Sequence, residues 1–209
     1  MISTSSIAGL RSIAGALVAL LLLSGCDNAS ITPPPVETRV DVDTPALRAL
    51  KARAGIDPCP AADGSSELPA QELACLGGGR AVDLSEVDGP AVVPLWASWC
   101  VRCRKELPIY QRLAERAGDR VTVLGVDYQD TQPDAALELL RRTGARFPSV
   151  ADPGGVLADT YRVRGLPAVA WVAKDGSVVL DNAKIDSYRD LVTLVSDRLG
   201  VDVRPAAAG

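Results

Sequence analysis

Two cysteines in a Cys-x-x-Cys arrangement are the residues whose types and spacing most directly suggest chemistry. Cys100 and Cys103 follow residues 91–97, an apolar run with the length of a buried strand. Apolar residues at helical spacing come after them: Leu107, Tyr110, Leu113 and Ala114. Cys100 is therefore predicted at a strand-to-helix junction, where unpaired backbone N–H groups and the helix dipole stabilise a thiolate.

A thiolate at this position can exchange electrons with a disulfide. We expect Cys100 to be the more exposed, attacking sulfur and Cys103 to be the buried, resolving sulfur. Arg102 lies between them, and Arg104 and Lys105 add positive charge. A zinc site is not expected, because it needs four ligands and the chain has no histidine and no second cysteine knuckle. No metal and no cofactor is predicted.

Hydrophobic periodicity predicts the elements that must position this motif. A second buried strand is predicted at residues 121–126, and a helix runs from Pro133 to its stop at Gly144. The remaining predicted elements are a short helix at 156–161, strands at 168–173 and 177–180 around the turn Lys174-Asp175-Gly176, and a last helix capped by Ser187 and Asp190. Helical crossovers imply parallel pairing and the hairpin adds antiparallel strands. The predicted fold class is α/β, with a mixed central sheet and helices on both faces.

The N-terminus has the features of an export signal. Arg11 precedes an apolar run at residues 13–23, which is too short to span a bilayer and fits a signal peptide over residues 1–25. Leu23-Ser24-Gly25-Cys26 resembles the bacterial lipobox, in which the cysteine is lipidated; an ordinary secretory cut is the alternative. Residues 26–43, with three prolines at 33–35, are predicted to be the lipid anchor and tether.

Three further segments complete the predicted organisation. Residues 44–80 are an N-terminal extension that begins with a helix capped by Thr44, residues 81–200 form the main domain, and residues 201–209 are a tail. The formal net charge is −4, and the cations are scattered along the chain. A nucleic-acid partner is therefore not expected.

The motif Trp96-Ala97-Ser98-Trp99-Cys100-Val101-Arg102-Cys103 resembles the active site of thioredoxin-fold oxidoreductases. Its continuation, residues 104–108, is similar to the membrane-anchored, extracytoplasmic TlpA/ResA-like branch. Further similarity lies at Phe147-Pro148, Asp152, Gly165-Leu166-Pro167 and Lys174-Asp175-Gly176. The resemblance covers roughly residues 80 to 200 and implies a thioredoxin-like fold.

Several residue roles are implied by this resemblance. Pro167 matches the family's cis-proline, which with Leu166 and Trp99 would bind substrate. Glu106 matches an acidic residue that tunes the thiol pKa together with Arg102; a solvated glutamate paired with an arginine is the alternative. Pro108 matches a proline that kinks the active-site helix.

Pro94 departs from the family pattern. Thioredoxins have a buried aspartate here, and proline is unusual in a central strand, so we expect a local bulge or irregularity. Without that carboxylate, proton transfer to Cys103 would have to use Glu106 or water.

The resemblance implies a thiol–disulfide oxidoreductase acting on exported proteins, anchored to the outer face of the membrane by lipidated Cys26. A reductase is favoured, fed by a membrane electron donor of the CcdA/DsbD type, and such proteins often reduce apocytochrome c. The alternatives are a disulfide-forming oxidase, a peroxidase, whose usual cysteine context is missing, and a non-catalytic partner-binding lipoprotein.

Cys59 and Cys75 form the second cysteine pair, and four unlipidated cysteines allow three pairings. We expect a structural disulfide between Cys59 and Cys75 beside the redox pair Cys100 and Cys103. Electron relay between the two pairs is the competing hypothesis.

Overall fold

The computed structural model describes residues 40–203, apart from the side chain of Asp159. The predicted signal peptide (residues 1–25), Cys26 and most of the predicted tether lie outside the described residues, as do residues 204–209. Within residues 40–203, no helix has the length and apolar character needed to cross a membrane.

A mixed six-stranded sheet forms the centre of the described region. The strand order is β6-β5-β3-β7-β8, with the short strand β4 also paired to β3. Strand β3 is parallel to β4 and β5 and antiparallel to β7; β5 is parallel to β6, and β7 and β8 form an antiparallel hairpin. The strands are β3 (Ala91–Trp96), β4 (Thr122–Val123), β5 (Gly125–Tyr128), β6 (Ser149–Asp152), β7 (Ala168–Val172) and β8 (Val178–Asp181).

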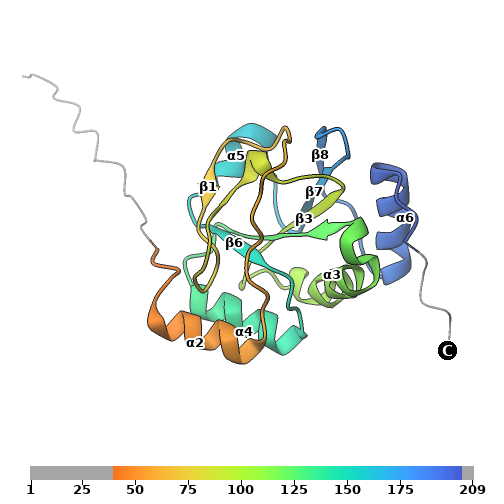
Figure 1. Cartoon of the computed structure of the whole chain (residues 1–209). Coiled ribbons are helices and arrows are strands. Elements are labelled where there is room, and N and C mark those ends of the chain that lie inside the picture. Colours follow the sequence, from red (N-terminus) through yellow and green to blue (C-terminus); the bar gives the residue numbers. More distant parts are fainter. Residues whose placement is uncertain (1–39, 204–209) are drawn as a thin grey trace, which may run out of the picture. The chain divides into compact units, whose positions relative to one another are not determined.

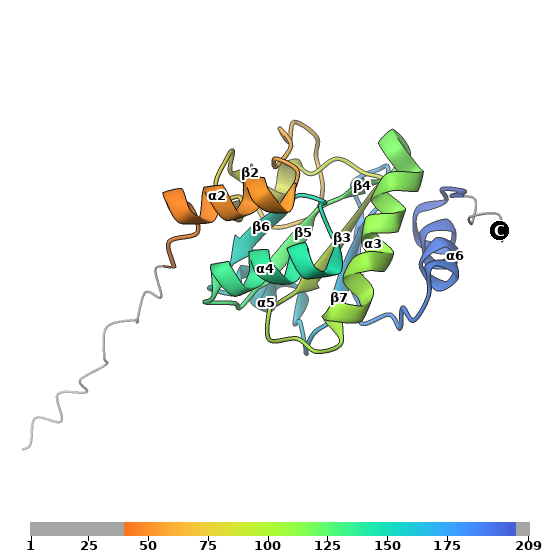
Figure 2. The ribbon, with the colours of Figure 1, turned by 90° about the horizontal axis from the view of Figure 1, so that it is seen from below.

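Helices cover both faces of this sheet. In Figure 1, α4 and α3 lie beneath the sheet and α5 lies above it; Figure 2 shows α2, α4, α3 and α6 together from below. The helices are α2 (Pro45–Ala54), α3 (Cys103–Ala117), α4 (Pro133–Thr143), α5 (Val156–Tyr161) and α6 (Tyr188–Leu199). The predicted α/β class, with a mixed sheet between helices, is confirmed.

Two hydrophobic cores follow from the alternation of side chains along β3. Val92 and Trp96 point to the core beneath the sheet, which also contains Cys100 and Cys103 and is called here the lower core. Val93 and Leu95 point to the opposite side, the upper core, which contains Cys59 and Cys75. The two cysteine pairs therefore lie in different cores, on opposite faces of the sheet.

The helix boundaries follow local sequence signals. Thr44 caps α2 by accepting a hydrogen bond from the backbone N–H of Leu47 at 3.2 Å, and Gly55 ends the helix in the left-handed region with φ 66°. Ser187 accepts from the backbone N–H of Asp190 at 3.2 Å, as the predicted cap of α6 requires. These short-range signals explain why the helices were predicted well.

Three short strands were not predicted, and two others were predicted as one. Strand β6 was not predicted, because its sequence Ser-Val-Ala-Asp shows no alternation of apolar and polar residues and is not a continuous apolar run. All four residues are nevertheless buried. The strand predicted at residues 121–126 is divided at Leu124 into β4 and β5. A two-stranded ribbon of β1 (Glu72–Leu73) and β2 (Val82–Asp83) also escaped prediction.

Pro94 interrupts a ladder without forming the predicted bulge. Strand β3 stays in one register against β7, with Pro94 opposite Val169. On the other side, the N–H of Leu124 donates to the carbonyl of Val92 at 3.2 Å. The next donor on that side of a parallel ladder would be the amide of residue 94, which proline lacks. The division between β4 and β5 falls at this point.

The folded region extends beyond both predicted ends of the domain. Val42, within the predicted tether, is buried, and so is Val203, within the predicted tail. Arg120 Nη1 also donates to the carbonyl of Asp202 at 2.7 Å. Residues 40–43 and 201–203 therefore pack with the main domain, because their apolar side chains complete the lower core.

Candidate active site

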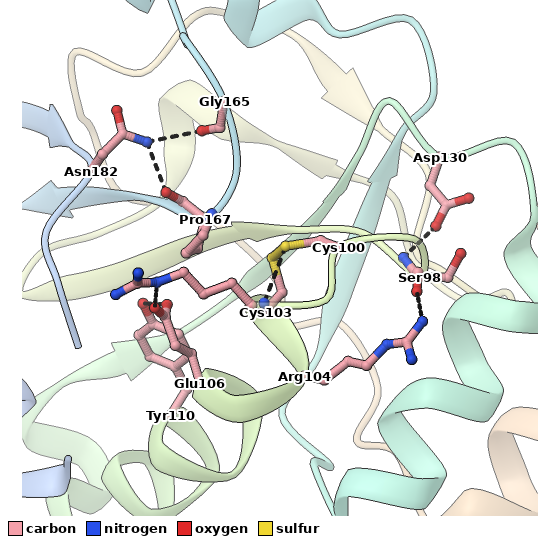
Figure 3. Close-up of a disulfide and its surroundings, with 11 residues drawn as sticks. Ser98, Cys100, Cys103, Arg104, Glu106, Tyr110, Asp130, Gly165, Pro167 and Asn182 are labelled. Carbon is pink, nitrogen blue, oxygen red and sulfur yellow. Dashed lines mark hydrogen bonds and ion pairs between the residues drawn. A yellow bond between two sulfur atoms is a disulfide. The ribbon is translucent and has the colours of Figure 1, made fainter. Parts of the chain in front are cut away.

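The loop between β3 and α3 holds the Cys100–Cys103 disulfide (Figure 3). The two sulfurs are 1.99 Å apart and the Cα atoms are 5.3 Å apart. Cys100 retains 5% of its surface and Cys103 retains 1%, in the predicted order. Helix α3 begins at Cys103. Cys100 therefore lies one turn before the helix, where its sulfur accepts a hydrogen bond from the backbone N–H of Cys103 at 3.1 Å.

Pro167 faces this disulfide from the loop that precedes β7 (Figure 3). The Leu166–Pro167 peptide bond is cis, as the resemblance at Pro167 predicts. The loop is held by Asn182, whose side-chain amide donates to the carbonyls of Gly165 at 2.8 Å and Pro167 at 2.7 Å. Asn182 was not predicted; its position directly after β8 is the only sequence signal for it. A second cis bond, Gly89–Pro90, was also not anticipated.

Exposed apolar side chains and cations surround the disulfide. Trp99 is 51% exposed and Val101 is 70% exposed, whereas Trp96 is buried in the lower core. The indole of Trp99 donates to the carbonyl of Gln129 at 3.3 Å, which fixes its orientation. A groove of about 440 Å³ runs beside the cis-proline; it is lined by Arg102, Arg164, Gly165, Leu166, Pro167 and the segment 182–184.

Glu106 is a buried carboxyl group on α3, one turn after Cys103. It retains 2% of its surface, so the alternative of a solvated glutamate is wrong, although it does pair with Arg102 at 3.4 Å. The hydroxyl of Tyr110 donates to its other oxygen at 3.5 Å. Burial raises the pKa of Glu106 to about 7, against the lowering effect of Arg102 and Tyr110.

Two aspartates at the end of β5 were missed by the sequence analysis. Asp130 accepts a hydrogen bond from the backbone N–H of Ser98 at 2.6 Å and another from Gln132 at 2.9 Å, so it ties the cysteine loop to the start of α4. Asp127 is buried, and burial, followed by the negative charge of Asp130, raises its pKa well above the usual range. Their position at the carboxyl end of a parallel strand, the end at which the cysteine motif follows β3, was the available signal.

The basic residues of the motif have separate contacts. Arg102 reaches both Glu106 and, at 3.5 Å, Asp186. Arg104 donates to the carbonyl of Ser98 at 3.3 Å and so supports the cysteine loop from the helix side.

The second disulfide joins Cys59 to Cys75, with 5.9 Å between their Cα atoms. The structure thus has the pairing that the sequence analysis selects. Cys75 forms an isolated β-bridge with Val150 of β6, at the edge of the sheet. Among residues 40–203, no cluster of three or more histidine, cysteine, aspartate or glutamate side chains is suited to a metal ion.

Comparisons with known proteins identify the relatives of this arrangement. The profile of the AhpC/TSA family matches residues 65–184, which is more than half of the chain. The chain belongs to the AhpC/TSA family. Curated relatives include the thiol-disulfide oxidoreductase ResA of Bacillus anthracis, 30% identical over 103 residues, or 48% of this chain and 59% of that protein. Another is the thiol:disulfide interchange protein CycY of Rhizobium leguminosarum, 32% identical over 126 residues, or 60% of this chain and 61% of CycY. The chain thus spans about 60% of the length of these relatives.

Solved structures agree with the fold described above. MTB dsbF, in mixed oxidised and reduced forms, superposes with a TM-score of 0.55 at 28% identity, covering 61% of this chain and 94% of dsbF. The exposed lipoprotein thioredoxin Etrx1 of Streptococcus pneumoniae superposes with a TM-score of 0.52 at 27% identity, covering 61% of this chain and 98% of Etrx1. The predicted thioredoxin-like fold is thereby confirmed.

Proposed function

We propose that this protein is a membrane-anchored thiol–disulfide oxidoreductase that reduces disulfides in exported proteins. The observation that carries the proposal is the Cys100–Cys103 pair at the start of α3, with cis-Pro167 facing it and an open groove beside that proline. The names of the curated relatives support the same chemistry.

Catalysis would begin with the reduced cysteine pair. The thiolate of Cys100 attacks one sulfur of the substrate disulfide, and a mixed disulfide forms while the other substrate sulfur leaves as a thiolate. Cys103 then attacks Cys100, which closes the disulfide seen in the structure and releases the second substrate thiol. The N–H of Cys103, which already donates to the sulfur of Cys100, would stabilise the attacking thiolate.

The surroundings of the pair would serve substrate binding and proton transfer. An extended substrate can lie in the groove between Pro167 and Arg102 and contact the exposed faces of Trp99 and Val101. Glu106, with a pKa of about 7, can hold or release a proton near neutral pH, and Arg102 modulates it. Glu106 would thereby take over the role of the buried aspartate that thioredoxins have at the position of Pro94.

Location and partners extend this proposal beyond the described residues. Cys26 would carry the lipid, and the similar protein Etrx1 is named an exposed lipoprotein. Reducing equivalents would come from a membrane donor of the CcdA/DsbD type, and oxidised apocytochrome c is the substrate we favour.

Substrate capture by the resolving-cysteine variant tests the reaction. Cys103→Ala should accumulate a mixed disulfide between Cys100 and an oxidised peptide with the haem-attachment pattern Cys-x-x-Cys-His, whereas Cys100→Ala should form none. A mixed disulfide formed equally well by both variants would contradict the proposal. Insulin reduction by the wild type, lost in Cys100→Ala, excludes a non-catalytic binding lipoprotein.

The redox state in cells distinguishes a reductase from an oxidase of the same fold. In cells that have the membrane donor, thiol trapping should find Cys100 and Cys103 mostly as thiols. In cells that lack the donor, it should find them mostly as a disulfide. A pair that stays oxidised while the donor is present would show that the protein forms disulfides instead.

A further inference from the structure

Lys51 is a buried cation beside the second disulfide. It projects from α2, retains 7% of its surface, and its ammonium donates to Cys75 Sγ at 3.0 Å and to the carbonyl of Gly78 at 2.9 Å. Burial lowers its pKa, and the smaller effect of the negative charge of Asp43 acts in the opposite direction. Asp43 itself is hydrogen-bonded to Arg48. Among residues 40–203, no carboxylate forms an ion pair with Lys51.

This arrangement is poorly matched to a disulfide and well matched to a thiolate. A disulfide sulfur is a neutral, weak acceptor, so the buried ammonium has the Gly78 carbonyl beside it but no anion in contact. A thiolate at Cys75 would be a charge-assisted acceptor at the same position. Reduction would therefore supply an anion to the ammonium of Lys51.

Cys59 has the complementary environment. Its sulfur lies 3.4 Å from the carbonyl oxygen of Ser149. In the disulfide this contact joins two acceptors, whereas a thiol at Cys59 could donate its hydrogen to that carbonyl. Each sulfur thus faces the partner that its reduced form needs: an acceptor for Cys59 and a cation for Cys75.

Access also differs between the two sulfurs. Cys59 retains 6% of its surface and lies between the exposed Pro58 and Pro60, whereas Cys75 retains 1% and is paired with β6. An incoming thiolate therefore meets Cys59 first, and the sulfur that must leave is the one beside Lys51.

We propose that Cys59–Cys75 is a second redox-active disulfide, in which an external protein dithiol attacks Cys59 and Cys75 leaves as a thiolate held by Lys51. Bond formation to Cys59 breaks the Cys59–Cys75 bond, and the electron pair goes to Cys75. The second thiol of the reductant then attacks the reductant's first sulfur, which is bonded to Cys59 in the mixed disulfide. Cys59 is released and ends as a thiol. The reductant becomes a disulfide, and one proton passes to solvent.

Independence from the first site follows from the fold. The two disulfides lie in separate cores on opposite faces of the sheet, so the second centre needs no relay from Cys100. The proposal does not depend on the direction or substrate of the reaction at Cys100, and its test can be made with that site removed.

The test uses the full chain carrying Cys100→Ser and Cys103→Ser, titrated with mixtures of reduced and oxidised dithiothreitol. Differential alkylation and peptide mass spectrometry report Cys59 and Cys75 separately from Cys26. Adding Lys51→Met, which keeps an apolar stem without the charge, should raise the ratio of reduced to oxidised dithiothreitol needed for half-reduction by about tenfold. Arg53→Met, an exposed cation on the same helix, should leave it unchanged. Equal midpoints for Lys51→Met and Arg53→Met would overturn the proposal.

Two further measurements keep the proposal testable if Lys51→Met folds poorly, which its thermal melting in the oxidised form would reveal. In the reduced chain with Lys51 intact, Cys75 should be alkylated as a thiolate at pH values well below about 8.5, the usual pKa of a thiol. Brief exposure of the oxidised chain to glutathione should place the adduct on Cys59. A Cys75 that reacts only above that pH, or an adduct found on Cys75, would contradict the proposal.

Discussion

Glu106 is a buried carboxyl group beside the cation of Arg102. Its ionisation makes the stability of the folded protein depend on pH. The carboxyl has a pKa of about 7 in the folded protein against a usual value of 4.5, because burial outweighs the attraction of Arg102. The folded state therefore binds more protons than the unfolded state between these two pH values. Its contribution to stability is complete below about pH 4.5 and is lost as the pH rises to about 7.

Replacing Glu106 by Gln should remove this dependence. The free energy of unfolding of Glu106→Gln, relative to the wild type, should increase between about pH 4.5 and about pH 7 and then stay level, because glutamine cannot ionise. Urea unfolding at closely spaced pH values measures the difference. Glu115→Gln, an exposed residue of the same helix, serves as the control. A constant difference across this range would mean that Glu106 ionises as it does in solution.

Residue identities in the active site were predictable where a short motif encodes them. Cys100, Cys103 and Pro167 were found because their spacing and neighbours are specific. Asp130 and Lys51 were not found, because a lone aspartate after a strand and a lone lysine in a helix are ordinary surface residues in a sequence. Their burial depends on contacts with residues more than 20 positions away.

The loop that carries Cys100 is positioned by elements on either side of it. Asp130, two residues after β5, accepts from the backbone N–H groups of Ser98 and Gln132, and Arg104 of α3 donates to the Ser98 carbonyl. The geometry of the cysteine pair therefore depends on β5 and α4 as well as on β3 and α3.

Asp130→Ala should loosen this loop and reduce stability by about 1–3 kcal/mol, because it leaves two backbone N–H groups without their acceptor. Insulin reduction should slow, and Asp130→Asn, which keeps one acceptor oxygen, should recover part of both losses. Denaturant unfolding and the activity assay measure these effects, with the exposed Asp119→Ala as the control. Activity and stability like those of Asp119→Ala would mean that Asp130 does not hold the loop.

Elements with a capping residue or clear periodicity were predicted, and those set by tertiary pairing were not. Thr44, Pro133 and Ser187 mark helix starts that the structure has. Strand β6 is defined by its pairing with β5 and by the Cys75–Val150 bridge, which no local pattern reveals. An irregularity at Pro94 was predicted, but its kind was not. It depends on which neighbouring strand faces the missing N–H of residue 94, and the sequence does not show this.

At the scale of the whole molecule, the sheet separates two disulfides that we assign to different reactions. One faces cis-Pro167, and the other lies at the sheet edge, where Cys75 forms a β-bridge with Val150. Residues 44–80 share both cores with the main domain, so the predicted extension is an integral part of the fold.

Anchoring through Cys26 is a prediction about the whole chain in its cell. Cys26→Ser, expressed with the native N-terminus, should move the protein from the membrane fraction to the soluble extracytoplasmic fraction while insulin reduction by the purified protein stays unchanged. Radiolabelled palmitate should mark the wild type only. Retention of the variant in the membrane would mean that the anchor lies elsewhere.

The most direct test of the account is the pH dependence of Cys100 alkylation in reduced Cys103→Ser protein, read at the peptide level. We expect Cys100 to react as a thiolate at pH values well below the usual thiol pKa of about 8.5, because the first N–H of α3 and nearby cations stabilise the charge. A Cys100 that stays unreactive in the folded protein until the pH exceeds about 8.5 would contradict it.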